Sequence, residues 1–179
     1  THPGDTVALD VANSSEVLDK LERGQADLGF IETPLPTPSM SELVIAHDQL
    51  VAVVRPDHPW NRRRPIEPEE LATTRLVMRE EGSGTRATLE SALREAGFGP
   101  PESVLELGST SAVRTAVLSG SSPTVISRLA VAAEIERGQL IEVDIAGLDI
   151  QRRLRAVWPE RKGLPKLAEA LLRDFEAAR

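Results

Sequence analysis

A run of glycines and small hydroxyl residues begins one predicted helix and could bind an anion. In GSGTRATLESAL, residues 82–93, Ser83 and Thr85 stand at the helix start and Arg86 lies in its first turn. The first acidic residue of this helix is Glu90. A helix N-terminus carries partial positive charge, so acids are favoured there and an arginine is unusual. We therefore expect backbone N–H groups, hydroxyls and the Arg86 guanidinium to converge on an anionic ligand.

A second cluster of hydroxyl residues repeats this pattern. Ser109, Thr110 and Ser111 open a predicted helix that contains Arg114 and no acidic residue through Gly120. Ordinary capping is the alternative for both helices, because serine and threonine are favoured N-caps and an arginine there costs roughly a few tenths of a kcal/mol. The residues alone leave both interpretations open.

The glycines allow two further interpretations. A P-loop requires a lysine after its last glycine, and none follows Gly84. The spacing from Gly82 through Gly84 to Ala87 fits the looser dinucleotide pattern, with Glu106 near the end of the next predicted strand. The acids at residues 80–81 are awkward beside a pyrophosphate, but a dinucleotide-dependent enzyme remains an alternative. No G-x-S-x-G elbow is present, and we expect no catalytic residues and no enzymatic activity.

Composition narrows the class of protein. The chain has 179 residues, 40% hydrophobic and 27% charged, as in a globular protein. Its net charge is −7, which disfavours DNA binding by this chain itself. There is no cysteine, and His2, His47 and His58 are far apart, so we expect no metal site and no cofactor. No run suits a membrane span or a signal peptide, and we expect a cytoplasmic protein without membrane contact.

Strand and helix patterns alternate along the chain, which predicts an α/β fold with mostly parallel sheets. The connector at residues 55–65 separates two such sets and indicates two lobes. The predicted strands cover residues 6–11, 26–31, 49–54, 75–78, 103–107, 123–127, 140–145 and 152–158. The predicted helices cover residues 14–24, 67–72, 85–97, 110–120, 128–138 and 165–178.

This alternation predicts where a ligand would bind. In parallel α/β units, helix N-termini follow the carboxyl ends of strands, where ligands bind. The first lobe would present residues 13–15 and 31–33 at such an edge, facing the two hydroxyl clusters of the second lobe. We therefore expect a cleft lined with hydroxyl groups. The paired acids at residues 69–70 and 80–81 are predicted to face solvent.

Several motifs, in this order and spacing, resemble the effector-binding domain of LysR-type transcriptional regulators. NSSEVLDKLERGQADLGFIE is similar to the family's helix, L-x-x-G and following strand, and LVAVVRPDHPW is similar to its crossing strand and H-P turn. LVMREEGSGTRATLESAL resembles the branch that regulates sulfur assimilation and carbon dioxide fixation. The stretch from ELGSTSAVRTAVLSG to VISRLAVAAEIERGQLIEV resembles the most characteristic part of the family. The chain departs from the family's G-x-G pattern at Ser121.

The resemblance implies a fold and a division into lobes. The fold would be that of the type II periplasmic-binding-protein class, with two Rossmann-like lobes. Lobe I would comprise residues 1–54 and 158–179, and lobe II residues 55–157. The family domain opens with a further strand and helix, and a winged helix-turn-helix precedes it. We expect these parts to be absent from this chain.

The resemblance also implies a function and a set of ligand contacts. A small anionic effector would bind between the lobes and modulate DNA binding by the absent N-terminal domain of a homodimer or homotetramer. The alternative from another class is an extracytoplasmic solute-binding protein for an oxyanion. Thr33 and Thr115 are further candidates, and Arg86 is added from the helix-end argument above. The contacts carried over from the family are Ser14, Glu32, Ser83, Gly84, Thr85, Ser109, Thr110 and Ser127.

Overall fold

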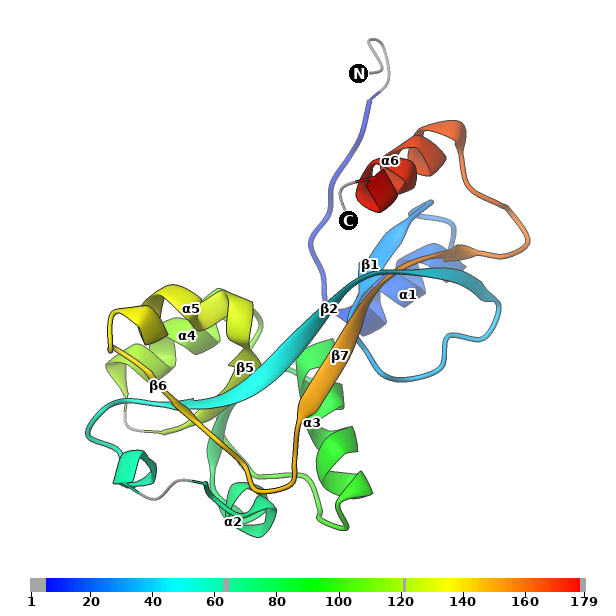
Figure 1. The fold of residues 1–179 in the computed structure, drawn as a ribbon. Helices are drawn as coiled ribbons and strands as arrows, with labels where there is room; N and C mark the ends of the chain where they lie inside the picture. The colour runs from blue at the N-terminus through cyan, green and yellow to red at the C-terminus, as the bar shows by residue number, and fades with distance from the viewer. Residues whose placement is uncertain (1–5, 63–64, 121, 178–179) are drawn as a thin grey trace.

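The structure, a computed structural model, describes residues 6–62, 65–120 and 122–177. Two long strands, β2 (Met40–Val54) and β7 (Ile150–Pro159), run side by side and join two groups of elements (Figure 1). One group, here called the α1 side, consists of α1 (Ser14–Glu22), β1 (Gly29–Ile31) and α6 (Lys166–Ala177). The other group, the α3 side, consists of η1 (Pro59–Arg62), α2 (Pro68–Thr73), β3 (Leu76–Arg79), α3 (Gly84–Glu95), β4 (Ser103–Leu107), α4 (Thr110–Ser119), β5 (Thr124–Ser127), α5 (Arg128–Glu136) and β6 (Ile141–Val143).

The main sheet is antiparallel. β2 and β7 pair antiparallel from Met40↔Pro159 to Leu50↔Ile150, with a register shift between Val44 and Ala46. β1 adds to β7, while β5 and β6 add to β2, all antiparallel. Within the described residues, the pair β3–β4 is the one parallel pair of strands. The prediction of mostly parallel sheets is therefore wrong for the main sheet, because the sequence pattern did not show that β2 and β7 cross between the two sides in opposite directions.

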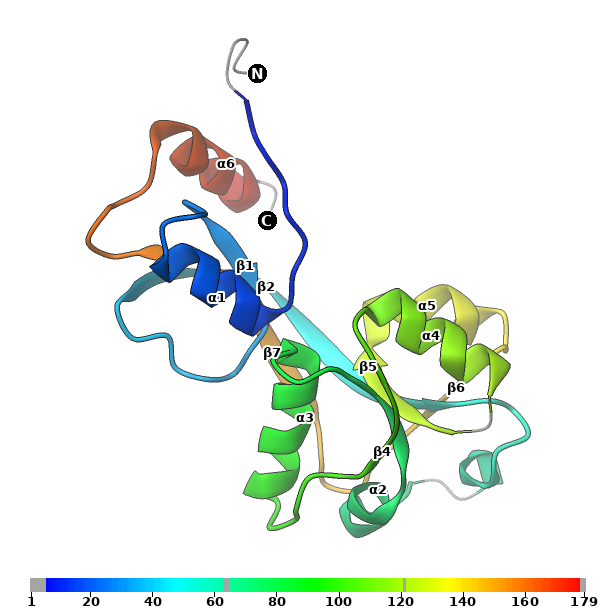
Figure 2. The same cartoon turned by 180° about the vertical axis from the view of Figure 1, so that it is seen from behind.

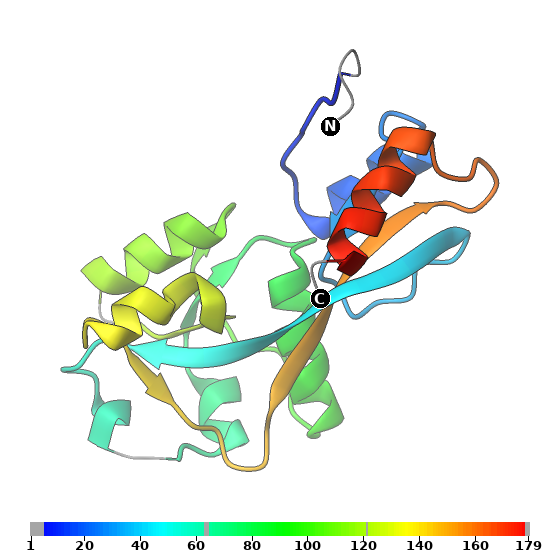
Figure 3. The ribbon, with the colours of Figure 1, turned by 45° about the horizontal axis from the view of Figure 1, so that its top comes forward.

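The α1 side is held by a capped helix on a short edge strand. Asn13 and Glu16 form the predicted capping box, in which each side chain accepts a hydrogen bond from the other residue's backbone N–H. Leu21 of α1 packs on Ile31 of β1 and on Val157 of β7. α6 lies beside this end of the sheet (Figure 3). Three fully buried residues make this a small core.

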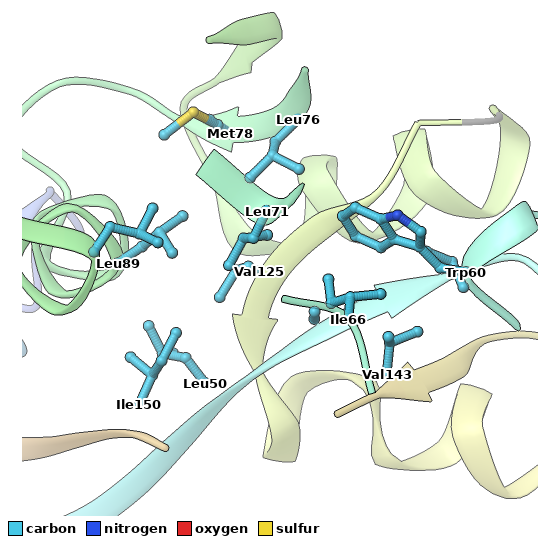
Figure 4. Packing of buried hydrophobic residues seen from close by; sticks show 13 residues of the cluster. Leu50, Trp60, Ile66, Leu71, Leu76, Met78, Leu89, Val125, Val143 and Ile150 are labelled. Carbon is cyan, nitrogen blue, oxygen red and sulfur yellow. The ribbon is translucent and has the colours of Figure 1, made fainter. Parts of the chain in front are cut away.

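The α3 side carries two larger cores on the two faces of the sheet. One cluster fills the space between the sheet, α2 and α3, and includes Trp60, Leu71 and Leu89 (Figure 4). The other packs α4 and α5 on β2, β3 and β5, with Val113 and Val131 at its centre. In Figure 2, α3 and α4 lie on opposite sides of β4. Both cores fix the starts of α3, α4 and α5 relative to the crossing strands.

Residues 6–11 are not a strand, contrary to prediction. They run as an irregular segment from the N-terminus to α1 (Figure 2). Val7, Leu9 and Val11 have exposed fractions of 70%, 85% and 88%. The alternating pattern is typical of a strand, but no described strand pairs with this segment, and a single strand leaves its backbone groups unpaired.

The predicted helices are present, with ends displaced by one or two residues. The predicted departure at Ser121 lies outside the described residues. Within the ranges that the structure describes, no helix combines the length and the apolar character needed to cross a membrane.

Candidate functional site

A buried ion pair lies where β2 and β7 cross between the two sides. Asp48 and Arg152 stand directly opposite each other in the strand pairing. Arg152 donates from Nε and Nη2 to one Asp48 carboxylate oxygen, at 2.8 and 2.6 Å. The side chains are only 5% and 3% exposed. A buried charge requires a partner, and each of these residues supplies the other's.

This ion pair brings together residues from both sides of the molecule. The remaining guanidinium nitrogen, Nη1, donates to the Glu32 carboxylate at 2.7 Å and to the Thr85 hydroxyl at 2.9 Å. Ser127 donates its hydroxyl to Asp48 at 3.1 Å. Glu32 follows β1, Thr85 lies in α3, and Ser127 ends β5. Two of the predicted site residues, Glu32 and Thr85, thus contact a cation that was not predicted, and a third, Ser127, contacts its partner Asp48.

The N-termini of α1 and α3 lie against each other beside this cluster. Ser14, the first residue of α1, accepts a hydrogen bond from the Glu32 backbone N–H at 3.3 Å. Gly84, the first residue of α3, packs so closely that a Cβ there would lie 2.7 Å from the backbone at Glu32 and Thr33. Only glycine allows this approach.

The other predicted residues of this region are buried around the same contact. Thr33 and Ser83 are 5% and 2% exposed. The Thr33 hydroxyl accepts from the Leu35 backbone N–H at 3.3 Å. Ser83 precedes α3, but its side chain makes no capping hydrogen bond to the helix. Its backbone N–H instead donates to the Glu80 carbonyl.

Ser109 and Thr110 form a separate group at the start of α4. Ser109 caps this helix by accepting from the Ala112 backbone N–H at 3.2 Å, which agrees with the ordinary capping interpretation. Thr110 accepts a hydrogen bond from Arg79 at 2.9 Å, and Arg79 also pairs with Glu80. Among the residues described, no hydrogen bond or ion pair joins Ser109 or Thr110 to Arg152.

Glu70 and Glu80 are half-buried, although both were predicted to face solvent. Glu70 accepts a hydrogen bond from Trp60 at 2.7 Å. Burial acts to raise the pKa of Glu80, but hydrogen bonds from Arg79, from its own backbone N–H and from Asn13 outweigh burial and lower this pKa. Glu80 therefore stays ionised between the starts of α1 and α4. The second acid of each pair, Glu69 and Glu81, is exposed as predicted.

Arg86 does not reach the hydroxyl residues, contrary to expectation. Its guanidinium donates to Glu90 at 2.8 Å and to Glu106 at 2.6 Å. The Glu90 hydrogen bond is the largest influence on the Arg86 pKa, and together with Glu106 it raises that pKa despite partial burial. The arginine is thus stabilised by acids one turn along and on β4. The guanidinium that lies at the start of α3 belongs to Arg152.

Arg114 and Thr115 also point away from this region. Arg114 donates to the Ala130 carbonyl at 3.2 Å and lies 3.7 Å from Glu134 of α5. Thr115 is exposed and lines an open groove between α4 and β4.

A separate cavity of about 310 Å³ lies between α5 and β2 and reaches Asp48.

Asp48 and Arg152 were missed by the sequence reasoning. Arg152 lies at the start of a predicted strand and Asp48 directly before one, and neither residue was singled out. The sequence held one usable signal. Each residue lies two positions from a buried residue of the same strand, since Leu50 and Ile150 are 2% and 3% exposed. Their direct pairing depends on the strand register, which one sequence does not reveal.

Comparisons with known proteins show which sequences the chain resembles. The model of the LysR substrate binding domain family matches residues 1–178. Over 158 residues the chain is 46% identical to an uncharacterised HTH-type transcriptional regulator of Mycobacterium tuberculosis, covering 85% of this chain and 50% of the relative. Over 177 residues it is 32% identical to the RuBisCO operon transcriptional regulator of Acidithiobacillus ferrooxidans, covering 99% and 57% respectively.

A solved structure agrees with these relatives. The regulatory domain of Synechocystis CcmR, in complex with 2-PG, matches with a TM-score of 0.85 and 26% identity, covering 99% of this chain and 85% of that one. The relatives are regulators and not enzymes, and the chain spans about half of their length.

Proposed function

The chain belongs to the LysR substrate binding domain family, and from this premise we propose that this effector-binding regulatory domain senses a small anionic metabolite. The family and the fold class predicted from the sequence are confirmed. The anion would bind between lobe I, residues 1–54 and 158–179, and lobe II, residues 55–157. In this division all of β2 falls in lobe I and most of β7 in lobe II, although both strands run between the α1 side and the α3 side.

One observation carries this proposal: the Arg152 guanidinium lies beside the adjoining N-termini of α1 and α3. Arginine binds carboxylate and phosphate groups through paired N–H donors. Helix N-termini add backbone N–H groups and a favourable dipole for negative charge. Thr85 already contacts Arg152, and Ser14 lies next to Glu32. A small anion would find at this place a guanidinium, a hydroxyl group and the N-termini of two helices.

The remaining predicted contacts complete the proposed site. Ser127 would hold Asp48 in place through its hydrogen bond. Thr33, Ser83 and Gly84 would line the bottom of the proposed site. Ser109 and Thr110 would form the opposite wall, at the start of α4. The complex of the CcmR regulatory domain with 2-PG supports the choice of a small ligand, because that domain shares the fold.

Binding would act on the longer protein to which such domains belong. We propose that an N-terminal helix-turn-helix domain of that longer protein contacts DNA, and that the whole protein is a cytoplasmic homodimer or homotetramer. An effector that binds one arrangement of the lobes more tightly shifts the population toward that arrangement. This shift would change the affinity of the whole protein for DNA. The domain itself would have neither catalytic activity nor a cofactor.

The test is thermal stabilisation by a panel of ligands: phosphate, sulfate, 2-PG and neutral sugars. We expect the anions to raise the melting temperature and the sugars to leave it unchanged. Thr85→Ala should weaken anion binding by about 1.5 kcal/mol, the low end for a contact to a charged group. Thr115→Ala is the matched control, since Thr115 is exposed on α4, and it should bind like the wild type. Stabilisation by sugars without stabilisation by anions would contradict the proposal.

A further inference from the structure

The two carboxylates that pair with Arg152, those of Asp48 and Glu32, differ in burial and in their number of hydrogen bonds. Asp48 is 3% exposed and accepts two hydrogen bonds from Arg152 and one from Ser127. Glu32 is 37% exposed and accepts a single hydrogen bond from Arg152, at 2.7 Å. Removing Asp48 from Arg152 would leave a buried, unpaired carboxylate, whereas the Glu32 carboxylate can turn into water.

The charges of this cluster limit how an anion can reach Arg152. One guanidinium faces two carboxylates, so the cluster already carries one excess negative charge when both are ionised. An anion added to this arrangement would meet like charge. An anion that takes the place of one carboxylate leaves the charge balance unchanged. Since Asp48 is fixed by its burial and its three hydrogen bonds, Glu32 is the carboxylate that can be exchanged.

We propose that Glu32 is an internal competitor, whose side chain fills the anion position at Arg152 until the effector displaces it. This inference rests on the proposed function and specifies how its site works. The Glu32 main chain is anchored, because its N–H donates to Ser14 and its carbonyl accepts from Thr88 at 3.5 Å. Only the side chain has to move. The position that it vacates is bordered by the Arg152 Nη1 and the Thr85 hydroxyl.

This exchange selects the chemical class of the ligand. A neutral ligand cannot replace the charge that Glu32 supplies to Arg152, so it would leave the guanidinium less well compensated. A carboxylate or a phosphate oxygen can replace it and can also accept a hydrogen bond from Thr85. Glu32 therefore discriminates against neutral molecules of similar shape. It also lowers the affinity for every anion, because the contact between Glu32 and Arg152 has to be broken first.

The test is a calorimetric titration of Glu32→Gln with phosphate and with 2-PG. The amide keeps the size of the side chain but loses the charge. We expect the variant to bind on the order of tenfold more tightly than the wild type, the factor for one weak charge-assisted hydrogen bond. The matched control is Glu42→Gln. Glu42 is also 37% exposed and pairs with a buried arginine, Arg155, but it lies away from Thr85. The affinity of Glu42→Gln for both anions should equal that of the wild type.

The possible outcomes separate this inference from the proposed function. Tighter binding by Glu32→Gln, with Glu42→Gln unchanged, supports both. Equal or weaker binding by Glu32→Gln, in a variant whose melting temperature shows that it is folded, overturns the competitor role and leaves an anion sensor. An equal gain in both variants also overturns it, because general charge would then be the cause. Failure of both anions to bind the wild type and Glu32→Gln would contradict the proposed function itself.

Discussion

Arg152 and Arg155 lie three residues apart on β7 and are equally buried, yet their surroundings differ. Arg155 donates to the backbone carbonyls of Thr33 and Leu35, at 2.6 and 3.0 Å, and pairs with Glu42. All of these partners belong to the α1 side and its end of β2. Arg152 instead contacts side chains that come from both sides of the molecule. Burial alone therefore does not distinguish a structural arginine from one suited to bind a ligand.

The nature of the partners makes the difference. A carbonyl of the main chain cannot leave an arginine without unfolding its segment, so Arg155 fastens the loop between β1 and β2. A carboxylate on a side chain can be exchanged for another anion by a rotamer change. The same residue type at the same depth can thus serve stability at one position and recognition at the other.

The largest expected effect tests which carboxylates are fixed. Asp48→Ala leaves Arg152 with Glu32 as its only carboxylate partner, and breaking a buried pair costs about 3–5 kcal/mol. Glu42→Ala should cost about 1 kcal/mol or less, because Glu42 is partly exposed and Arg155 keeps its two carbonyl partners. Urea unfolding followed by tryptophan fluorescence gives both free energies. Equal losses would remove the distinction between a fixed and an exchangeable carboxylate.

A smaller effect separates recognition from stability directly. Lysine lacks the planar fork of arginine and cannot serve several partners at once. Arg152→Lys should weaken phosphate binding by about 1.5–3 kcal/mol. Arg155→Lys should leave phosphate binding unchanged but lower the free energy of unfolding by about 1–3 kcal/mol, since a buried carbonyl loses its donor. Calorimetry and urea unfolding on the same two variants measure both quantities. The comparison fails if Arg155→Lys weakens binding as much as Arg152→Lys does.

The smallest effect concerns a third pair, Arg79–Glu80, which is half-buried at the start of α4. The folded protein lowers the pKa of Glu80, so this carboxyl stabilises the fold above its ordinary pKa of 4.5, and the contribution is lost as the pH falls below that value. Glu80→Gln should cost below about 1 kcal/mol at pH 7 and less at pH 3.5. Free energies of unfolding at both pH values provide the measurement. A cost that grows on acidification would show that the sign is wrong.

Much of the fold was predictable because helix ends and strand runs are local properties. The capping box at Asn13 and the helix beginning near Gly84 could be read directly from neighbouring residues. The antiparallel sheet could not, because the direction of β2 relative to β7 depends on contacts between residues about a hundred positions apart. Residues 6–11 were misread because a strand requires a partner, and a pattern within one segment does not say whether a partner exists.

The candidate site was predictable to a similar extent. Ser14, Glu32 and Thr85 were found from helix ends and from the family resemblance, and the structure brings them together. Arg86 was a misleading signal, because an arginine at a helix start can be satisfied by acids such as Glu90 and Glu106. The guanidinium that does lie there comes from a strand, and only the strand register brings it to the helix start.

The register shift between Val44 and Ala46 has a mechanical consequence. β2 and β7 form a narrow ribbon between the two sides, with β1 pairing on one side of the shift and β5 and β6 on the other. A ribbon of two strands resists stretching, because its ladder of hydrogen bonds would have to break, but it twists easily, and a bulge concentrates that twist. Reorientation of one side against the other should therefore be a rotation about the long axis of this ribbon, and the pair Asp48–Arg152 lies close to the register shift.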